Sequence, residues 1–274
     1  MRLVVSFTTT PTRIHKIEPM LKSILTQTRQ PDFIIANLPN EYIRDKNELI
    51  IPDFIKNNEK IIVNRCQDYG PATKLVGVLN KKNIFDKNDY IITVDDDIKY
   101  QNNLLEFYEK FIKINNNNVY GLSGFDFTSN GSFNWISEQK ILYSCDCLEG
   151  WASISYPFKF LKNNILLELK VAPKYLLFSD DVLISNYFKK VTKLILIRTN
   201  DFNHHKNVIL GYGDEKDALH NQKGDATHYL NYKNSYKYLT SKNKNNMNNS
   251  DFLKLFRLLA YHKRKSHRWS KNRY

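Results

Sequence analysis

The sequence predicts an α/β protein with a mixed central sheet flanked by helices. In the first half, short apolar runs of strand length alternate with amphipathic stretches, an order typical of a parallel sheet with right-handed crossovers. The second half instead holds Gly- and aromatic-rich segments that alternate like antiparallel strands. At 274 residues, 42% of them hydrophobic, the chain is long enough for one such domain with a C-terminal addition.

The first half is expected to contain four parallel strands. Apolar runs place them at residues 3–7, 33–38, 60–64 and 90–94. The expected helices lie near residues 17–28, directly after Pro52, and from the turn at residues 68–71 to about residue 81. Strands and helices in this order form a Rossmann-like half.

The second half is expected to combine further strands with helices. The pattern predicts a helix near residues 104–114 and antiparallel strands within residues 121–135 and 140–156. It then predicts a helix after Asp181, a strand at residues 194–197, a Gly-rich loop at residues 211–214 and an amphipathic C-terminal helix near residues 252–261. A basic tail follows that helix.

Three consecutive aspartates are the strongest candidate for a functional site. Asp95, Asp96 and Asp97 follow the apolar run at residues 90–94, which places their charges at the carboxyl edge of the sheet, where α/β proteins bind ligands. Such close like charges repel one another unless a cation neutralises them. Mg²⁺ and Mn²⁺ prefer oxygen ligands and often bridge a carboxylate to a diphosphate, so we expect a metal-diphosphate site. The alternative is a polar loop or helix start, where Asp is common.

The charge and cysteine content limit the partners and the compartment. A formal net charge of +13 indicates attraction to phosphates, nucleic acid or a membrane surface, and residues 261–274 carry six of the Lys and Arg residues and no acid. The three cysteines form neither a zinc-ligand pattern nor a disulfide framework, which favours a cytoplasmic location. Since no apolar stretch reaches the length of a membrane span, we expect a soluble protein, with peripheral membrane contact through the tail left open.

Five motifs in order resemble the GT-A glycosyltransferases, nucleotide-sugar-dependent enzymes of the family 2-like, Asp-x-Asp type. The motifs are Val-Ser-Phe-Thr-Thr-Thr-Pro-Thr-Arg at 5–13, Asp-Tyr-Gly-Pro-Ala-Thr-Lys-Leu at 68–75, Val-Asp-Asp-Asp-Ile at 94–98, Glu-Gly-Trp at 149–151 and Ser-Asp-Asp-Val at 179–182. The resemblance covers about residues 1–230. It implies a donor-binding half at 1–100, an acceptor-binding half at 101–230, and a separate C-terminal helix and basic tail at 231–274.

The resemblance also implies a reaction and a donor site. A hexosyltransferase-like enzyme would move a sugar from a nucleoside-diphosphate sugar, here a UDP-sugar, to a hydroxyl of a glycan, lipid or protein. The implied metal ligands for Mn²⁺ or Mg²⁺ are Asp95, Asp97 and a histidine, with His220 first, His228 second, and His204 and His205 behind them. The implied donor contacts are Thr8, Arg13, Asp68 for a uracil, Lys74 for a phosphate, Asp95 for the ribose and Asp96 for the sugar.

Catalysis is assigned by the same resemblance. Inverting transfer needs a base for the acceptor hydroxyl, and Asp181 is the first choice, with Asp180 beside it to share hydrogen bonds or raise its pKa. The alternative is that both aspartates only cap the helix that follows them. Glu149, Gly150 and Trp151 are the expected acceptor contacts, although Trp151 can equally be a core residue.

Two other functional classes remain open. A metal-dependent phosphatase or nuclease would also use clustered aspartates, but haloacid dehalogenase-type phosphatases carry Asp-x-Asp-x-Thr/Val after the first strand, and here Lys99 fills the last place after the fourth. A nucleic-acid-binding module could use the basic tail with Tyr261, Trp269 and Tyr274 as stacking groups. Because that module leaves the aspartates unexplained, no nucleic-acid partner is expected.

Overall fold

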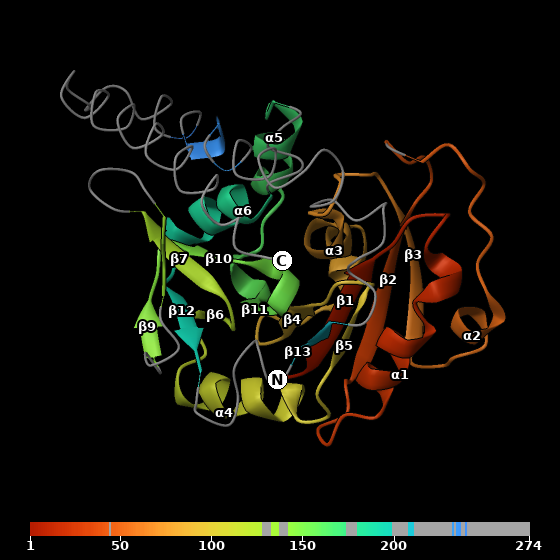
Figure 1. Cartoon of the computed structure of the whole chain (residues 1–274), viewed down its shortest axis with the longest axis horizontal. Coiled ribbons are helices and arrows are strands. Elements are labelled where there is room, and N and C mark those ends of the chain that lie inside the picture. Colours follow the sequence, from red (N-terminus) through yellow and green to blue (C-terminus); the bar gives the residue numbers. More distant parts are fainter. Residues whose placement is uncertain are drawn as a thin grey trace, which may run out of the picture.

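An eight-stranded mixed sheet with the strand order β3-β2-β1-β4-β11-β6-β12-β9 forms the centre of the computed structural model (Figure 1). The predicted α/β class, with a mixed central sheet flanked by helices, is therefore confirmed. The structure describes residues 1–43, 45–127, 133–136, 142–173, 180–198, 208–210, 232, 234–236 and 239.

The first half of the sheet is parallel, as predicted. Its strands are β1 (Leu3–Thr8), β2 (Phe33–Pro39), β3 (Ile61–Cys66) and β4 (Tyr90–Thr93). β1 pairs in parallel with both β2 and β4, and β2 pairs in parallel with β3. The loops that leave β1 and β4 at their carboxyl ends are consequently neighbours.

The second half of the sheet is mixed. β11 (Ile154–Pro157) runs antiparallel to both β4 and β6 (Val119–Gly121). β12 (Leu194–Ile197) is parallel to β6, and β9 (Leu142–Ser144) pairs antiparallel with β12 at the edge. Two smaller sheets join β10 (Cys147–Leu148) and β8 (Phe133–Trp135) to β7 (Gly124–Phe127), and β5 (Ile98–Tyr100) to β13 (Val208–Leu210).

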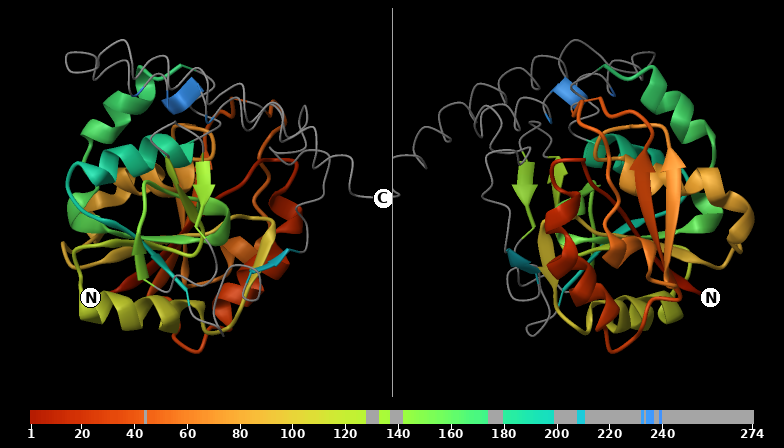
Figure 2. Two further views of the ribbon diagram at one scale, coloured as in Figure 1. Left: turned by 60° about the vertical axis from the view of Figure 1, so that its left-hand side comes forward. Right: turned by 90° about the vertical axis from the view of Figure 1, so that its right-hand side faces the viewer.

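Helices cover both faces of the sheet (Figure 2). On one face lie α1 (Glu18–Leu25), α2 (Asp53–Lys56) and α4 (Leu104–Ile114), and on the other α3 (Thr73–Val76), α5 (Asn164–Lys170) and α6 (Asp180–Lys189). Side chains alternate along β1, so that Val5 packs with the first group and Val4 with the second. Short 3₁₀ segments lie at Ile14–Lys16, Gly77–Ile84, Gly150–Ala152 and Phe158–Phe160.

One predicted helix is shorter than expected. The turn at residues 68–71 does open a helix, but α3 ends at Val76 and continues as the 3₁₀ segment Gly77–Ile84. Strand side chains hydrogen-bond the backbone carbonyls here, with Ser6 donating to Lys74 and the Asn64 amide donating to Gly77 at 2.8 Å. A Cβ on Gly77 would lie 2.6 Å from Oδ1 of the buried Asn37, so close packing requires glycine at this position.

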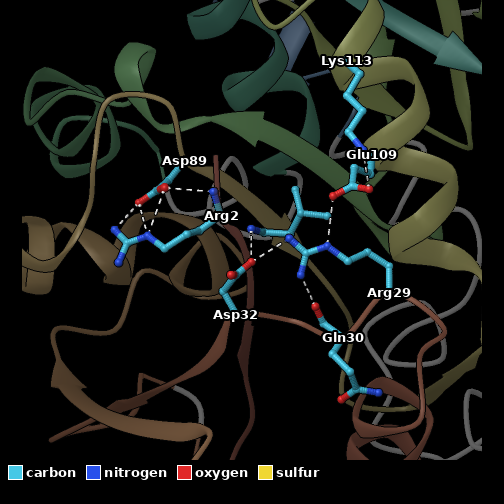
Figure 3. A network of polar contacts seen from close by, with 8 residues as sticks. Arg2, Arg29, Gln30, Asp32, Asp89, Glu109 and Lys113 are labelled. Atoms are coloured by element: carbon cyan, nitrogen blue, oxygen red, sulfur yellow. Dashed lines mark hydrogen bonds and ion pairs between the residues drawn. The ribbon is translucent and has the colours of Figure 1, made fainter.

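A polar network connects elements near the amino ends of β1 and β4, at the end of these strands opposite to the aspartate triplet (Figure 3). Arg2 donates to Asp89 through Nε at 3.2 Å and ties the start of β1 to the start of β4. Arg29 donates to Asp32 at 2.8 Å and to Glu109 at 3.0 Å, which anchors α4 to the same edge. These charges stabilise the scaffold and lie away from the aspartate triplet.

Some predicted features lie outside the described residues. These are the Gly-rich loop at 211–214, the helix near 252–261 and the basic tail. In the part of the chain that is described, no helix has the length and apolar character needed to cross a membrane. The three cysteines are buried free thiols.

Candidate active site

The aspartate triplet follows β4 directly and is covered by the loop after β1. The guanidinium of Arg13 donates to both oxygens of Asp96, at 2.9 and 3.2 Å, and forms an ion pair with Asp97 at 2.9 Å. The Thr9 hydroxyl donates to Asp96 at 2.5 Å. The backbone amide of Asp95 donates to the buried Tyr100 hydroxyl at 2.8 Å, which fixes the start of the triplet.

Lys74 is a buried cation that connects the triplet to the second half of the chain. The residue is 7% exposed, and its ammonium group forms an ion pair with Asp95. Burial by itself lowers the pKa of Lys74, but the carboxylates of Asp95, Asp180 and Asp181 outweigh it, and the pKa is raised above its usual value. Lys74 therefore stays protonated at neutral pH. Because α3 is only four residues long, any phosphate contact here depends on this side chain rather than on a helix dipole.

Asp180 and Asp181 begin α6 and have different environments. Both oxygens of Asp181 are held, Oδ1 by the Gly150 amide and Oδ2 by the Tyr232 hydroxyl, each at 2.9 Å. Asp180 is 6% exposed, and its Oδ2 has no hydrogen-bond partner among the described residues. Burial, reinforced by the Asp181 carboxylate, raises the pKa of Asp180 to about 7 despite the opposing charge of Lys74.

The Glu-Gly-Trp motif lies against these groups. A Cβ on Gly150 would come 2.9 Å from Nζ of Lys74 and 3.0 Å from Oδ1 of Asp181, so the glycine lets the cation and the carboxylate share one small space. Glu149 is buried and accepts from the Ser123 hydroxyl at 2.6 Å. Trp151 is half-buried and packs against the main core cluster.

The site thus combines groups from both halves of the sheet. In the described part of the chain it contains six carboxyl groups, those of Asp95, Asp96, Asp97, Glu149, Asp180 and Asp181. Its cations are Lys74, Arg13 and the buried Arg198, whose positive charge acts to lower the pKa of Glu149. Carboxyl groups outnumber cations, and this surplus adds to burial in raising the pKa values of Asp180 and Glu149.

Not every predicted residue reaches this cluster. The Thr8 hydroxyl donates to the Asn37 carbonyl at 2.8 Å, and it is Thr9 that contacts the triplet. Asp68 accepts from the amides of Ile43 and Gly70, each at 2.7 Å, and from the Thr73 hydroxyl at the start of α3 at 3.3 Å. His204, His205, His220 and His228 lie outside the described residues.

Asp95 and Asp97 could hold a metal ion only together with further ligands, because the structure pairs them with Lys74 and Arg13. Among the described residues, no group of three or more His, Cys, Asp or Glu side chains is arranged to hold an ion alone. Mg²⁺-like ions are usually bound through one or two carboxylates together with substrate phosphates and water. If Asp95 and Asp97 bind such an ion, its remaining ligands would come from a diphosphate and water.

The sequence interpretation missed four residues that shape the site. Thr9 lies in a run of three threonines, where spacing does not show which hydroxyl faces inward. Tyr100 follows the triplet closely and could have been suspected from that spacing. Arg198, which donates to the Leu122 and Ile136 carbonyls at 2.8 Å, and Tyr232 reach the site only through tertiary packing, for which the sequence carries no periodic signal.

The burial of Glu149 predicts a specific pH dependence of stability. Burial raises the pKa of Glu149 to about 7, so the folded state binds more protons than the unfolded state as pH rises from about 4.5 to 7, and stability falls across that window. Glu149→Gln removes this loss. We expect it to be more stable than wild type at pH 8 by roughly 1–3 kcal/mol and nearly equal at pH 5. Urea unfolding at both pH values measures this, with the exposed Glu48→Gln as control. A wild-type advantage at pH 8 would contradict it.

Comparison with known proteins gives a likeness at the level of the fold. No family model matches the chain, and no curated protein matches it. Among solved structures, TarS 1–349 from S. aureus in complex with UDP superimposes with a TM-score of 0.48 at 14% identity, covering 74% of this chain and 59% of that one. A second structure of S. aureus TarS 1–349 gives a TM-score of 0.47 at 14% identity with the same coverage. The chain thus spans less than two thirds of TarS 1–349.

Proposed function

We propose that the protein is a glycosyltransferase that moves a sugar from a nucleoside-diphosphate sugar, a UDP-sugar in the first instance, to an acceptor hydroxyl. The observation that carries the proposal is the cluster at the carboxyl edge of the sheet, where Lys74 lies between the aspartate triplet and the acidic pair of α6. A ligand with negative phosphates and a neutral sugar matches such a cluster, because the cation can contact the phosphates and the neighbouring carboxylates can accept hydrogen bonds from the sugar hydroxyls.

The donor is proposed to bind over β1 and β4. Lys74 would contact a diphosphate oxygen, and Arg13 would hold Asp96 in place for the sugar hydroxyls. Thr8 and Asp68 remain our proposed ribose and base contacts from the resemblance. Asp95 and Asp97, with a histidine such as His220, are the proposed ligands of Mn²⁺ or Mg²⁺. When bound, the ion supplies positive charge that stabilises the departing diphosphate.

The acceptor is proposed to enter beside Glu149, Gly150 and Trp151. Asp181 would take the proton of its hydroxyl while that oxygen forms a bond to the anomeric carbon and the bond from carbon to the diphosphate oxygen breaks. The nucleoside diphosphate then leaves with the electron pair. Attack on the face opposite the leaving group gives inversion. The acceptor can be a glycan, lipid or protein, and residues 261–274 would attract an anionic acceptor or membrane surface.

Release of nucleoside diphosphate from a panel of nucleotide sugars in Mn²⁺ tests the proposal. Release from one sugar nucleotide, without release of inorganic phosphate from simple phosphate esters, is the expected result. Hydrolysis of phosphate esters or nucleic acid instead would replace the transferase by a phosphatase or nuclease. Binding of single-stranded DNA at physiological salt, with no turnover of any donor, would favour the nucleic-acid module.

The triplet should respond unequally to substitution. Asp97→Asn is expected to lower turnover more than Asp96→Asn because Asp97 is the proposed metal ligand. Arg13 pairs with both residues, but both oxygens of Asp96 accept from Arg13 and one also accepts from Thr9. Steady-state rates with the identified donor measure the order. Both variants should keep the wild-type melting temperature within a few degrees. The reverse order would mean that the metal ligand is Asp96.

A further inference from the structure

Tyr232 is buried in the acceptor half although it follows the part of the chain that the family resemblance covers. Its side chain is 2% exposed and packs in one apolar cluster with Phe125, Cys147 and Val182. The ring meets that of Phe125 edge-to-face, with centroids 5.6 Å apart. Further along, Tyr236 packs against Phe127 with ring centroids 4.5 Å apart. These contacts attach Tyr232 to β7 and α6, and Tyr236 to β7.

The polar end of Tyr232 points at Asp181. Its hydroxyl donates to Oδ2 at 2.9 Å, while the Gly150 amide donates to Oδ1 at the same distance. Burial first, and then the nearby Asp181 carboxylate, raise the pKa of Tyr232 well above its usual value, so the hydroxyl remains a proton donor. Two donors from separate parts of the chain therefore fix the plane of one carboxylate.

This arrangement still leaves Asp181 able to act on a substrate. A carboxylate has about four acceptor positions, and the two contacts occupy one on each oxygen. The remaining positions can receive an acceptor hydroxyl. A carboxylate that is free to turn would spend less time in the reactive orientation, and small errors of orientation reduce rates strongly.

We propose that Tyr232 is a positioning residue that holds the carboxylate of Asp181 in its reactive orientation, so that Tyr232 belongs functionally to the acceptor half. The inference rests on the proposed transferase function. It extends that function by making turnover depend on a residue beyond position 230, which neither the motifs nor their spacing assign.

Tyr232→Phe tests the role because it keeps the ring and removes only the hydroxyl. We expect kcat for donor turnover to fall about tenfold, the size expected for one hydrogen bond to a charged group, with UDP affinity and KM for the donor within about twofold of wild type. The matched control is Tyr187→Phe on α6, the helix that carries Asp181. The Tyr187 hydroxyl donates to the Phe160 carbonyl at 2.9 Å and accepts from the Lys162 amide at 3.1 Å. That variant should lose some stability and keep its kcat.

A double variant separates positioning from general destabilisation. If Tyr232 acts through Asp181, then Tyr232→Phe should change kcat little once Asp181→Asn is present. An equal fall in both backgrounds, or wild-type kcat in the single variant, would overturn the inference while leaving the transferase proposal intact. A wild-type protein that turns over no nucleotide sugar would overturn both.

A second substitution keeps the test valid if Tyr232→Phe folds poorly. Site-specific replacement of Tyr232 by 3-fluorotyrosine retains shape and hydrogen bond but makes the hydroxyl a stronger donor, which weakens Asp181 as a base. Because the hydrogen bond that orients the carboxylate is kept, we expect kcat to fall by no more than about twofold, through the weaker base, at an unchanged melting temperature. A tenfold or larger fall would count against the inference.

Discussion

Asp181→Asn is expected to lower kcat by about 100-fold or more while leaving UDP affinity nearly unchanged, the usual pattern for loss of a general base. Asparagine keeps the size of the side chain, and its carbonyl oxygen can still accept from the Gly150 amide while its NH2 group donates to the Tyr232 hydroxyl, but it cannot take up a proton. Steady-state kinetics with the identified donor and calorimetry with UDP measure the two quantities.

Two comparisons make this result specific. Asp146→Asn removes a carboxylate that pairs with Lys189, the last residue of α6. This variant should keep the wild-type kcat. Asp180→Asn tests the other member of the acidic pair, whose raised pKa also suits proton transfer. If Asp180→Asn is inactive and Asp181→Asn is active, the base is Asp180. If both are active, the two aspartates only cap α6.

Lys74→Met is expected to be the most destabilising substitution in the site. It removes a buried cation and leaves Asp95, Asp180 and Asp181 with less compensating charge, and breaking a buried ion pair from one side typically costs about 3–5 kcal/mol. Donor affinity should also fall, by about 1–3 kcal/mol, through the lost phosphate contact. Urea unfolding and calorimetry with UDP measure these effects.

An exposed lysine serves as the control for Lys74→Met, and a second substitution should restore part of its lost stability. Lys110→Met breaks an exposed pair with Glu106 and should cost less than about 1 kcal/mol. Adding Asp95→Asn to Lys74→Met removes one uncompensated carboxylate and should restore part of the stability but none of the donor affinity. If Lys74→Met were as stable as Lys110→Met, Lys74 would not be the counter-ion of the cluster.

The strands and helices that the sequence predicted correctly are those marked by apolar runs or by regular apolar spacing within the segment itself. The strands up to residue 94 follow from apolar runs, and the position of Asp95 at a sheet edge follows from the run that precedes it. The helix at residues 104–114 has the predicted bounds because its apolar spacing is regular. In all of these, periodicity and burial indicate the same element.

The missed parts depend on contacts between distant residues. The helix after residues 68–71 is shorter than its pattern suggests, and side chains of distant strands donate to the Lys74 carbonyl in it and to the Gly77 carbonyl just after it. The pairing of Arg13 with Asp96 spans 83 positions, and that of Tyr232 with Asp181 spans 51. Side-chain partners at such separations are set by tertiary packing, which residue type and spacing in one sequence do not show.

Calorimetric titration of the wild-type protein with UDP, once in Mn²⁺ and once in EDTA, tests most directly whether the cluster around Lys74 and the aspartate triplet binds a nucleoside diphosphate with a divalent ion. The account predicts saturable binding in Mn²⁺ that is weaker by about tenfold or more in EDTA, because the ion and the diphosphate bind together. Equal affinity in the two buffers would contradict the metal role of Asp95 and Asp97. No binding of UDP or of another nucleoside diphosphate in either buffer would contradict the account as a whole.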